Sequence, residues 1–116
     1  MSGAASFDRP AGATVERELV GVVAAPADRV FADLATRLDP HGASSYAADP
    51  ASRRIVVQGD YWYRGEYEVA AADEGSRVTY TIVNVSPGWQ VLGRLTGRGV
   101  VRAAPREFAA MLALLG

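Results

Sequence analysis

The fold of this chain is decided by residues 61–69, YWYRGEYEV, and by residues 75–80, GSRVTY, which follow closely. Aromatic, β-branched and charged residues are interleaved in both stretches, as is typical of strands in a sheet. Residues 73–75, DEG, have the composition of a hairpin turn. We therefore predict two strands, at residues 61–70 and 77–85, that pair in the antiparallel direction.

Three further strands are predicted upstream of this pair. Residues 53–58 contain the apolar run IVV, and residues 44–48 precede them across a turn at residues 49–52. Residues 15–23 interleave β-branched residues with charges. Because the later strands follow one another by short connections, we expect an antiparallel meander.

Two helical segments complete the pattern. Residues 27–38 carry apolar side chains at helical spacing, and Pro26 suits the first turn, where no N–H donor is needed. From residue 89 onward the pattern is again helical, but Gly97, Gly99 and Pro105 interrupt it. We predict either one kinked helix there or two helices. This order of elements predicts an α+β domain with helices on one face of an antiparallel sheet.

Length and composition place further limits on the chain. Its 116 residues make one domain, which we assign to residues 14–116, with residues 1–13 as a loose, disordered tail. The chain has no cysteine and one histidine, so we expect no disulfide, no metal site and no cofactor. The formal net charge of −1 does not favour nucleic-acid binding. With no membrane span of about 20 apolar residues and no secretory signal, we expect a cytoplasmic protein.

Residues 23–31, VAAPADRVF, resemble the apolar–x–Ala–Pro–x–x–x–Val–aromatic opening of the START-like superfamily. This superfamily, also called SRPBCC, includes polyketide cyclases and dehydratases. Residues 61–69 and 75–80 are similar to the strand pair in which such domains place a Gly-x-Arg-Val-x-Tyr hairpin. The resemblance covers residues 15–115 and implies the helix-grip fold, a curved antiparallel sheet around a C-terminal helix with a cavity between them. The family usually has more strands than the five that we expect here.

The same resemblance implies that a small apolar ligand binds in this cavity, such as a lipid, an isoprenoid or a polyketide-like compound. Strand alternation places Tyr61, Tyr63 and Tyr67 on one face, and tyrosine offers both apolar area and a hydroxyl to a ligand. These tyrosines could equally be ordinary core residues. The candidate ligand-binding residues are Phe31, Leu34, Tyr61, Tyr63, Tyr67, Tyr80, Ile82, Trp89 and Leu92.

Two other functions remain open. A shift of one residue in register would place Trp62, Arg64 and Glu66 in the cavity. An aromatase/cyclase-type enzyme needs a polar group there, for which the candidates are Arg64, Glu66, Tyr63 and Tyr80. The alternative for Arg64, Glu66 and Glu68 is a solvent-side ladder of charges with Arg77, and we lean towards a protein without catalytic activity. The second function is an interaction module with a closed pocket, which could form a homodimer.

Two polar features carry less weight. His41 lies in a predicted surface loop, and one histidine alone does not define a catalytic site. Arginines recur every four residues from Arg94 to Arg106, and we interpret them as a solvated helix face rather than a site for phosphates or anionic lipid.

Overall fold

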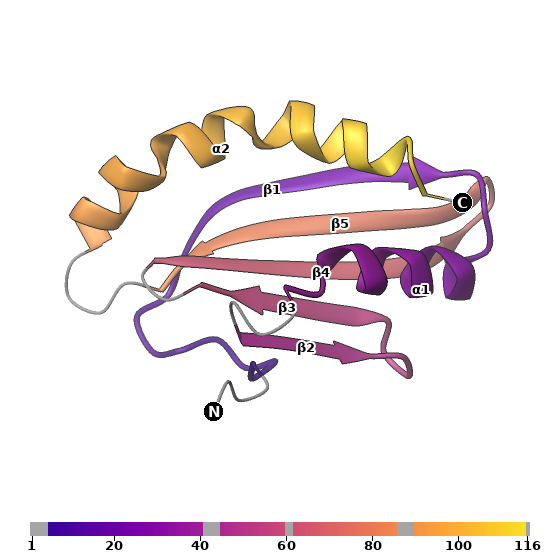
Figure 1. The fold of residues 1–116 in the computed structure, drawn as a ribbon, viewed down its shortest axis with the longest axis horizontal. Helices are drawn as coiled ribbons and strands as arrows, with labels where there is room; N and C mark the ends of the chain where they lie inside the picture. The colour runs from indigo at the N-terminus through magenta and orange to yellow at the C-terminus, as the bar shows by residue number, and fades with distance from the viewer. Residues whose placement is uncertain (1–4, 41–44, 60–61, 86–89, 116) are drawn as a thin grey trace.

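The computed structural model describes residues 5–40, 45–59, 62–85 and 90–115, with the backbone alone for residues 90–98. It is an α+β structure of five strands and two helices (Figure 1). In chain order the elements are β1 (Thr14–Val23), α1 (Ala27–Leu38), β2 (Ser45–Asp49), β3 (Arg54–Gln58), β4 (Tyr63–Ala72), β5 (Gly75–Asn84) and α2 (Gln90–Leu112). The predicted fold class is confirmed.

The five strands form one antiparallel sheet in the order β1-β5-β4-β3-β2. Strands β2 to β5 form the predicted meander. The last strand, β5, pairs on its other side with the first strand, β1, and Leu19 of β1 faces Tyr80 of β5. The two strands nearest the N-terminus are therefore the two edges of the sheet.

Both helices cover the same face of the sheet, which we call the inner face. Helix α1 lies over β3, β4 and β5, whereas α2 runs along β1 and β5 (Figure 1). Val30 and Leu34 of α1 are fully buried against this face. Burial of each such side chain contributes about 1.5–3 kcal/mol to folding. The layout is that of a helix grip.

The junction between β1 and α1 is held by the start of β5. Gly75 has a φ of +134°, and a Cβ atom there would overlap the carbonyl oxygen of Val23. The buried hydroxyl of Ser76 donates to the carbonyl of Ala25 at 2.6 Å. Only glycine fits this close approach, which places the hairpin turn against the end of β1.

Helix α2 is a single curved helix with Pro105 inside it (Figure 1). Of the two alternatives that the sequence left open, the structure has the one continuous helix. Proline lacks the N–H that would bond to the carbonyl four residues earlier, which accounts for a bend without ending the helix. Among the described residues, no helix combines the length and the apolar character that a membrane crossing requires.

Residues 5–9 lie against the sheet on the face opposite to the helices, which we call the outer face. The backbone N–H of Ala5 donates to the carbonyl of Tyr46 on β2 at 3.2 Å. Further along, the Arg9 side chain forms an ion pair with Glu66 on β4. We call residues 5–9 the N-terminal strap. The sequence suggested a loose tail here because none of these partners is near in the chain.

Candidate functional site

Three tyrosines share the inner face of β4 and β5. Tyr67 and Tyr80 face each other in register, and their rings stack with centroids 4.4 Å apart and planes inclined by 6°. Phe108 of α2 packs on Tyr80 with the ring centroids 5.7 Å apart. The stacked pair therefore forms the part of the sheet that supports the C-terminal half of α2.

The third tyrosine, Tyr63, completes a hydroxyl cluster with this pair. Its hydroxyl lies 2.5 Å from that of Tyr80. The Tyr63 ring folds back along its own strand over Gly65, where an added Cβ would overlap the Tyr63 hydroxyl. The spacing Tyr-x-Gly-x-Tyr thus lets two tyrosines of one strand bring their hydroxyls together. We call Tyr63, Tyr67 and Tyr80 the tyrosine cluster.

The environment keeps these hydroxyls protonated. Burial raises the pKa of Tyr67, and the neighbouring Tyr63 and Tyr80 raise it further. Burial also raises the pKa of Tyr63, with Tyr80 adding to the effect. For Tyr80, burial raises the pKa more than the hydrogen bonds from the other two tyrosines lower it. The cluster is therefore a set of neutral hydroxyls, able to donate a hydrogen bond but not to act as bases.

The other predicted ligand-binding residues fall into two groups. Phe31, Leu34 and Ile82 are buried in the same core as the tyrosine cluster. Tyr61 and Trp89 lie outside the described residues, as does the side chain of Leu92. Trp62, which the sequence placed on the other face, is buried in the core and meets Tyr63 edge-on, with ring centroids 5.5 Å apart. It precedes the start of β4, so strict alternation does not apply to it.

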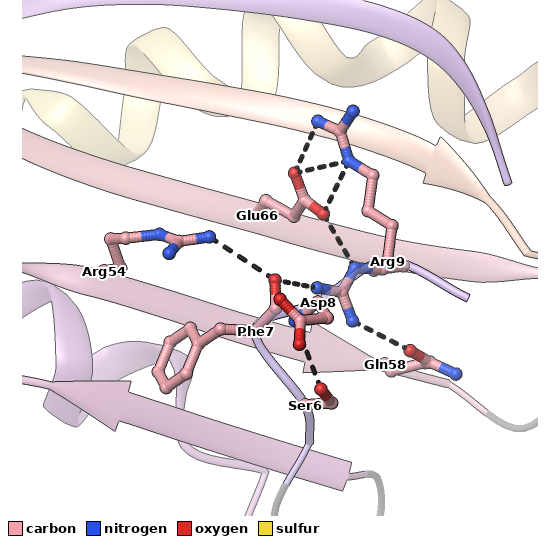
Figure 2. A network of polar contacts seen from close by, with 8 residues as sticks. Ser6, Phe7, Asp8, Arg9, Arg54, Gln58 and Glu66 are labelled. Atoms are coloured by element: carbon pink, nitrogen blue, oxygen red, sulfur yellow. Dashed lines mark hydrogen bonds and ion pairs between the residues drawn. The ribbon is translucent and has the colours of Figure 1, made fainter. Parts of the chain in front are cut away.

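Glu66 lies on the outer face, away from the helices (Figure 2). Arg64, two residues earlier on β4, shares that face by strand alternation. Arg64 is completely buried, and its Nε donates to a Glu66 carboxylate oxygen at 2.7 Å. The two Nη atoms donate to the side chain of Gln58 at 3.2 Å and to the carbonyl of Phe7 at 3.1 Å. A ladder open to solvent was therefore the wrong prediction for Arg64, because the N-terminal strap covers it.

Glu66 is shared between two arginines. Arg9 of the strap binds both carboxylate oxygens, with contacts of 2.7 to 3.1 Å (Figure 2). Arg64 binds the same carboxylate from within β4. Burial alone would raise the pKa of Glu66, but the hydrogen bonds from Arg9 and Arg64 outweigh it and hold the pKa below its ordinary value. A carboxylate so fully engaged is a structural ion pair rather than a general acid or base.

Two of the hollows on the surface of the described residues are lined by arginine side chains. One, of about 280 Å³, lies on the outer face beside the strap and is lined by Arg9, Arg54, Glu66, Tyr67, Glu68, Thr79 and Thr81. The other, of about 440 Å³, lies along α2 and is lined by Gly99, Arg102, Ala103, Pro105 and Arg106. Arg102 and Arg106 are exposed there, as predicted for a solvated helix face.

Among the described residues, the remaining polar candidates add no catalytic group. His41 lies outside the described residues. The described part of the chain holds no group of three or more His, Asp or Glu side chains arranged for a metal ion. Glu68 is exposed on the outer face beside Thr79, so it does not join Glu66 as a second buried carboxylate.

Comparison with protein-family models, with curated proteins and with solved structures finds no match for this chain. The relationship to the START-like superfamily therefore remains a prediction from the motifs at residues 23–31 and 61–80. The tyrosine cluster could be anticipated from strand alternation. The position of Gly65 between Tyr63 and Tyr67 could have indicated its role. Nothing in the sequence near Arg64 indicates that its partners lie in the strap.

Proposed function

We propose that this protein binds a small apolar molecule carrying a neutral polar group, on the inner face of the sheet beside the tyrosine cluster, without catalysing a reaction. The observation that carries the proposal is the meeting of the Tyr63 and Tyr80 hydroxyls at 2.5 Å in an otherwise apolar layer. Tyrosine hydroxyls placed in a core cost free energy unless they are hydrogen-bonded. Here they bond to each other, and a ligand carbonyl or hydroxyl can take the place of one of them.

Tyr63 is the natural contact point for such a ligand. It is half-buried, whereas Tyr67 and Tyr80 are buried. It also lies at the end of β4 opposite Asn84 on β5, close to where the chain leaves the sheet towards α2. A ligand that reached Tyr63 from this end would meet apolar core residues, neutral hydroxyls and the buried side chain of Asn84, a combination that is usual in small-molecule sites.

The position of the charged residues supports binding rather than catalysis. A cyclase-type enzyme needs a polar group beside its substrate, for which the candidates are Arg64, Glu66, Tyr63 and Tyr80. Arg64 and Glu66 lie on the outer face, where they are engaged with the N-terminal strap. The tyrosine hydroxyls on the inner face are held in their neutral form.

Native mass spectrometry of gently purified protein, followed by displacement of an apolar fluorescent dye, tests this proposal. We expect a co-purified small molecule and dye binding that Tyr63→Phe weakens about five- to tenfold, the effect of one lost hydrogen bond. Tyr46→Phe is the matched control, because the Tyr46 hydroxyl donates to the Ala35 carbonyl at 2.8 Å, away from the cluster. A protein that carries no small molecule and binds no dye would contradict the proposal.

A second function, an interaction module without a ligand, is favoured by one observation. Tyr67, Tyr80 and Phe108 pack in direct succession beneath the C-terminal half of α2. Ring stacking of this kind fills the space between helix and sheet there. If the dye does not bind, we expect the protein to act through contacts made by its surface rather than through a ligand bound in its interior.

A further inference from the structure

Strand β1 is an open edge of the sheet. Among the described residues, β1 is ten residues long and pairs with β5 alone, whereas the opposite edge, β2, has five residues and receives the N–H of Ala5. Natural edge strands are usually protected by proline, lysine, a bulge or short length. The bulge of β1 lies between Val15 and Arg17, so residues 18–23, ELVGVV, continue as a regular strand with neither proline nor lysine.

The exposed apolar side chains of this edge lie on the outer face. Val20 faces Thr79 in register, and Thr79 lines the outer hollow. Val20 and Val22 are 55% and 51% exposed. The inner face of the same strand is covered, because a Cβ at Gly21 would overlap the side chain of Leu112 on α2. The free part of β1 is therefore its backbone edge together with two valines on the outer face.

We propose that β1 pairs with β1 of a second copy of this chain, antiparallel and centred on Val20, so that the two sheets become one. A two-fold axis perpendicular to the sheet keeps the outer faces of both copies on the same side. When this axis passes through the Val20 position, Val20 of one copy lies opposite Val20 of the other. Leu19 then lies opposite Gly21, and Glu18 opposite Val22, in each case across the two copies. The four valines then cover one another on the outer face.

Charge complementarity favours this register over one centred on Glu18. Centring the pair on Glu18 would set the two Glu18 side chains against each other, and like charges directly opposite are destabilising. In the pair centred on Val20, Glu18 of one copy lies opposite Val22 of the other copy. On its other side, that Val22 lies next to Arg77 of β5. Glu18 and Arg77 are then two strand spacings apart, about 10 Å, with long side chains that can meet over the valine. Within the described residues neither side chain forms an ion pair in its own copy, although Glu18 is near enough to Arg9 to help raise the pKa of that guanidinium.

Cross-linking through an introduced thiol tests the pairing directly. The chain contains no cysteine, so Val20→Cys carries a single thiol, and directly opposite Cβ atoms lie about 4.5–5.5 Å apart. Mild oxidation to a disulfide, or a short bifunctional thiol-reactive cross-linker, should convert most of this variant to a covalent dimer. Val15→Cys is the matched control, since Val15 is 47% exposed on the same strand but lies outside the paired register. Equal cross-linking of the two variants overturns the proposal.

Solution measurements on the cysteine-free protein give an independent test. Sedimentation equilibrium should show a dimer whose dissociation constant rises by about tenfold or more in Val20→Glu and changes little in Val15→Glu. Glu18→Arg should weaken the dimer, and Glu18→Arg combined with Arg77→Glu should restore it. Within one copy these two positions are too far apart for the exchange to act, because Glu18 faces Thr81, about 13 Å along β5 from Arg77. The proposal is overturned if the wild-type chain remains monomeric at millimolar concentration. This holds even if the β1 edge then binds an added peptide.

Discussion

The hydroxyls of Tyr63 and Tyr80 lie 2.5 Å apart because Gly65, between Tyr63 and Tyr67 on β4, has no side chain. The Tyr63 ring occupies the space that a Cβ at position 65 would need. One glycine thus determines whether the tyrosine cluster forms. This dependence can be tested without knowledge of any ligand.

Gly65→Ala should displace the Tyr63 ring and break its bond with Tyr80. We expect the free energy of unfolding to fall by about 1–3 kcal/mol, the usual cost of overpacking in a core. Gly59→Ala is the control, since a Cβ there would have its nearest neighbours at 3.9 Å, an ordinary contact distance. Urea unfolding measures both, and equal stability of the two variants would show that Tyr63 does not need this space.

Glu66→Gln should destabilise the protein strongly because it leaves the buried Arg64 guanidinium without a counter-charge. Removing one partner of a buried ion pair costs about 3 kcal/mol or more. Glu68→Gln changes the same residue type two positions along the same face, where the side chain is exposed, and should stay within about 0.5 kcal/mol of the wild type. A small effect of Glu66→Gln in urea unfolding would mean that the strap does not bury this pair.

The stability of the protein should fall on acidification. The pKa of Glu66 is lowered in the folded state from its ordinary value of 4.5, so the unfolded state binds a proton more readily. Its contribution is therefore fully present above about pH 4.5 and is lost as the pH falls through the lower, folded pKa. Thermal unfolding between neutral pH and pH 3 should show this loss.

The comparison for this pH dependence is Glu66→Gln. Asp49 contributes to the same slope, since the hydrogen bond from Ser52 lowers its pKa too, and this contribution persists in the variant. We expect a shallower decline of the melting temperature in Glu66→Gln than in the wild type. Parallel curves for the two proteins would assign the acid sensitivity to other groups.

Gly75→Ala should be among the most damaging single changes in the chain. Its φ of +134° is disfavoured for any residue with a Cβ, and the added atom would overlap the backbone of Val23. We expect a loss of about 3 kcal/mol or more in unfolding free energy. Gly12→Ala separates the two causes, because Gly12 also has a positive φ, of +81°, but has no atom within 4 Å of the added Cβ. It should cost about 1 kcal/mol, and similar losses in both variants would contradict this account.

Local patterns in the sequence were sufficient for much of the fold. Alternation in residues 61–69 placed Tyr63 and Tyr67 on one face and Arg64 and Glu66 on the other, because side-chain direction along a strand depends only on neighbouring residues. Helical periodicity placed α1 at Ala27–Leu38 for the same reason. The order of the elements then limited the architecture to helices on one face of an antiparallel sheet.

Other features were decided only by contacts between segments distant in the chain. The burial of Arg64 depends on the carbonyl of Phe7, 57 residues away in sequence, which no local pattern can indicate. The continuity of α2 through Pro105 is another case, since packing of Phe108 against Tyr80 on the sheet can offset one lost hydrogen bond. Local sequence patterns were thus enough to indicate where each element lies and, Trp62 apart, which way the side chains of residues 62–69 point, because both depend on neighbouring residues. Tertiary structure decided which charges are buried and which edge is free, because burial depends on what the rest of the chain brings to cover each surface.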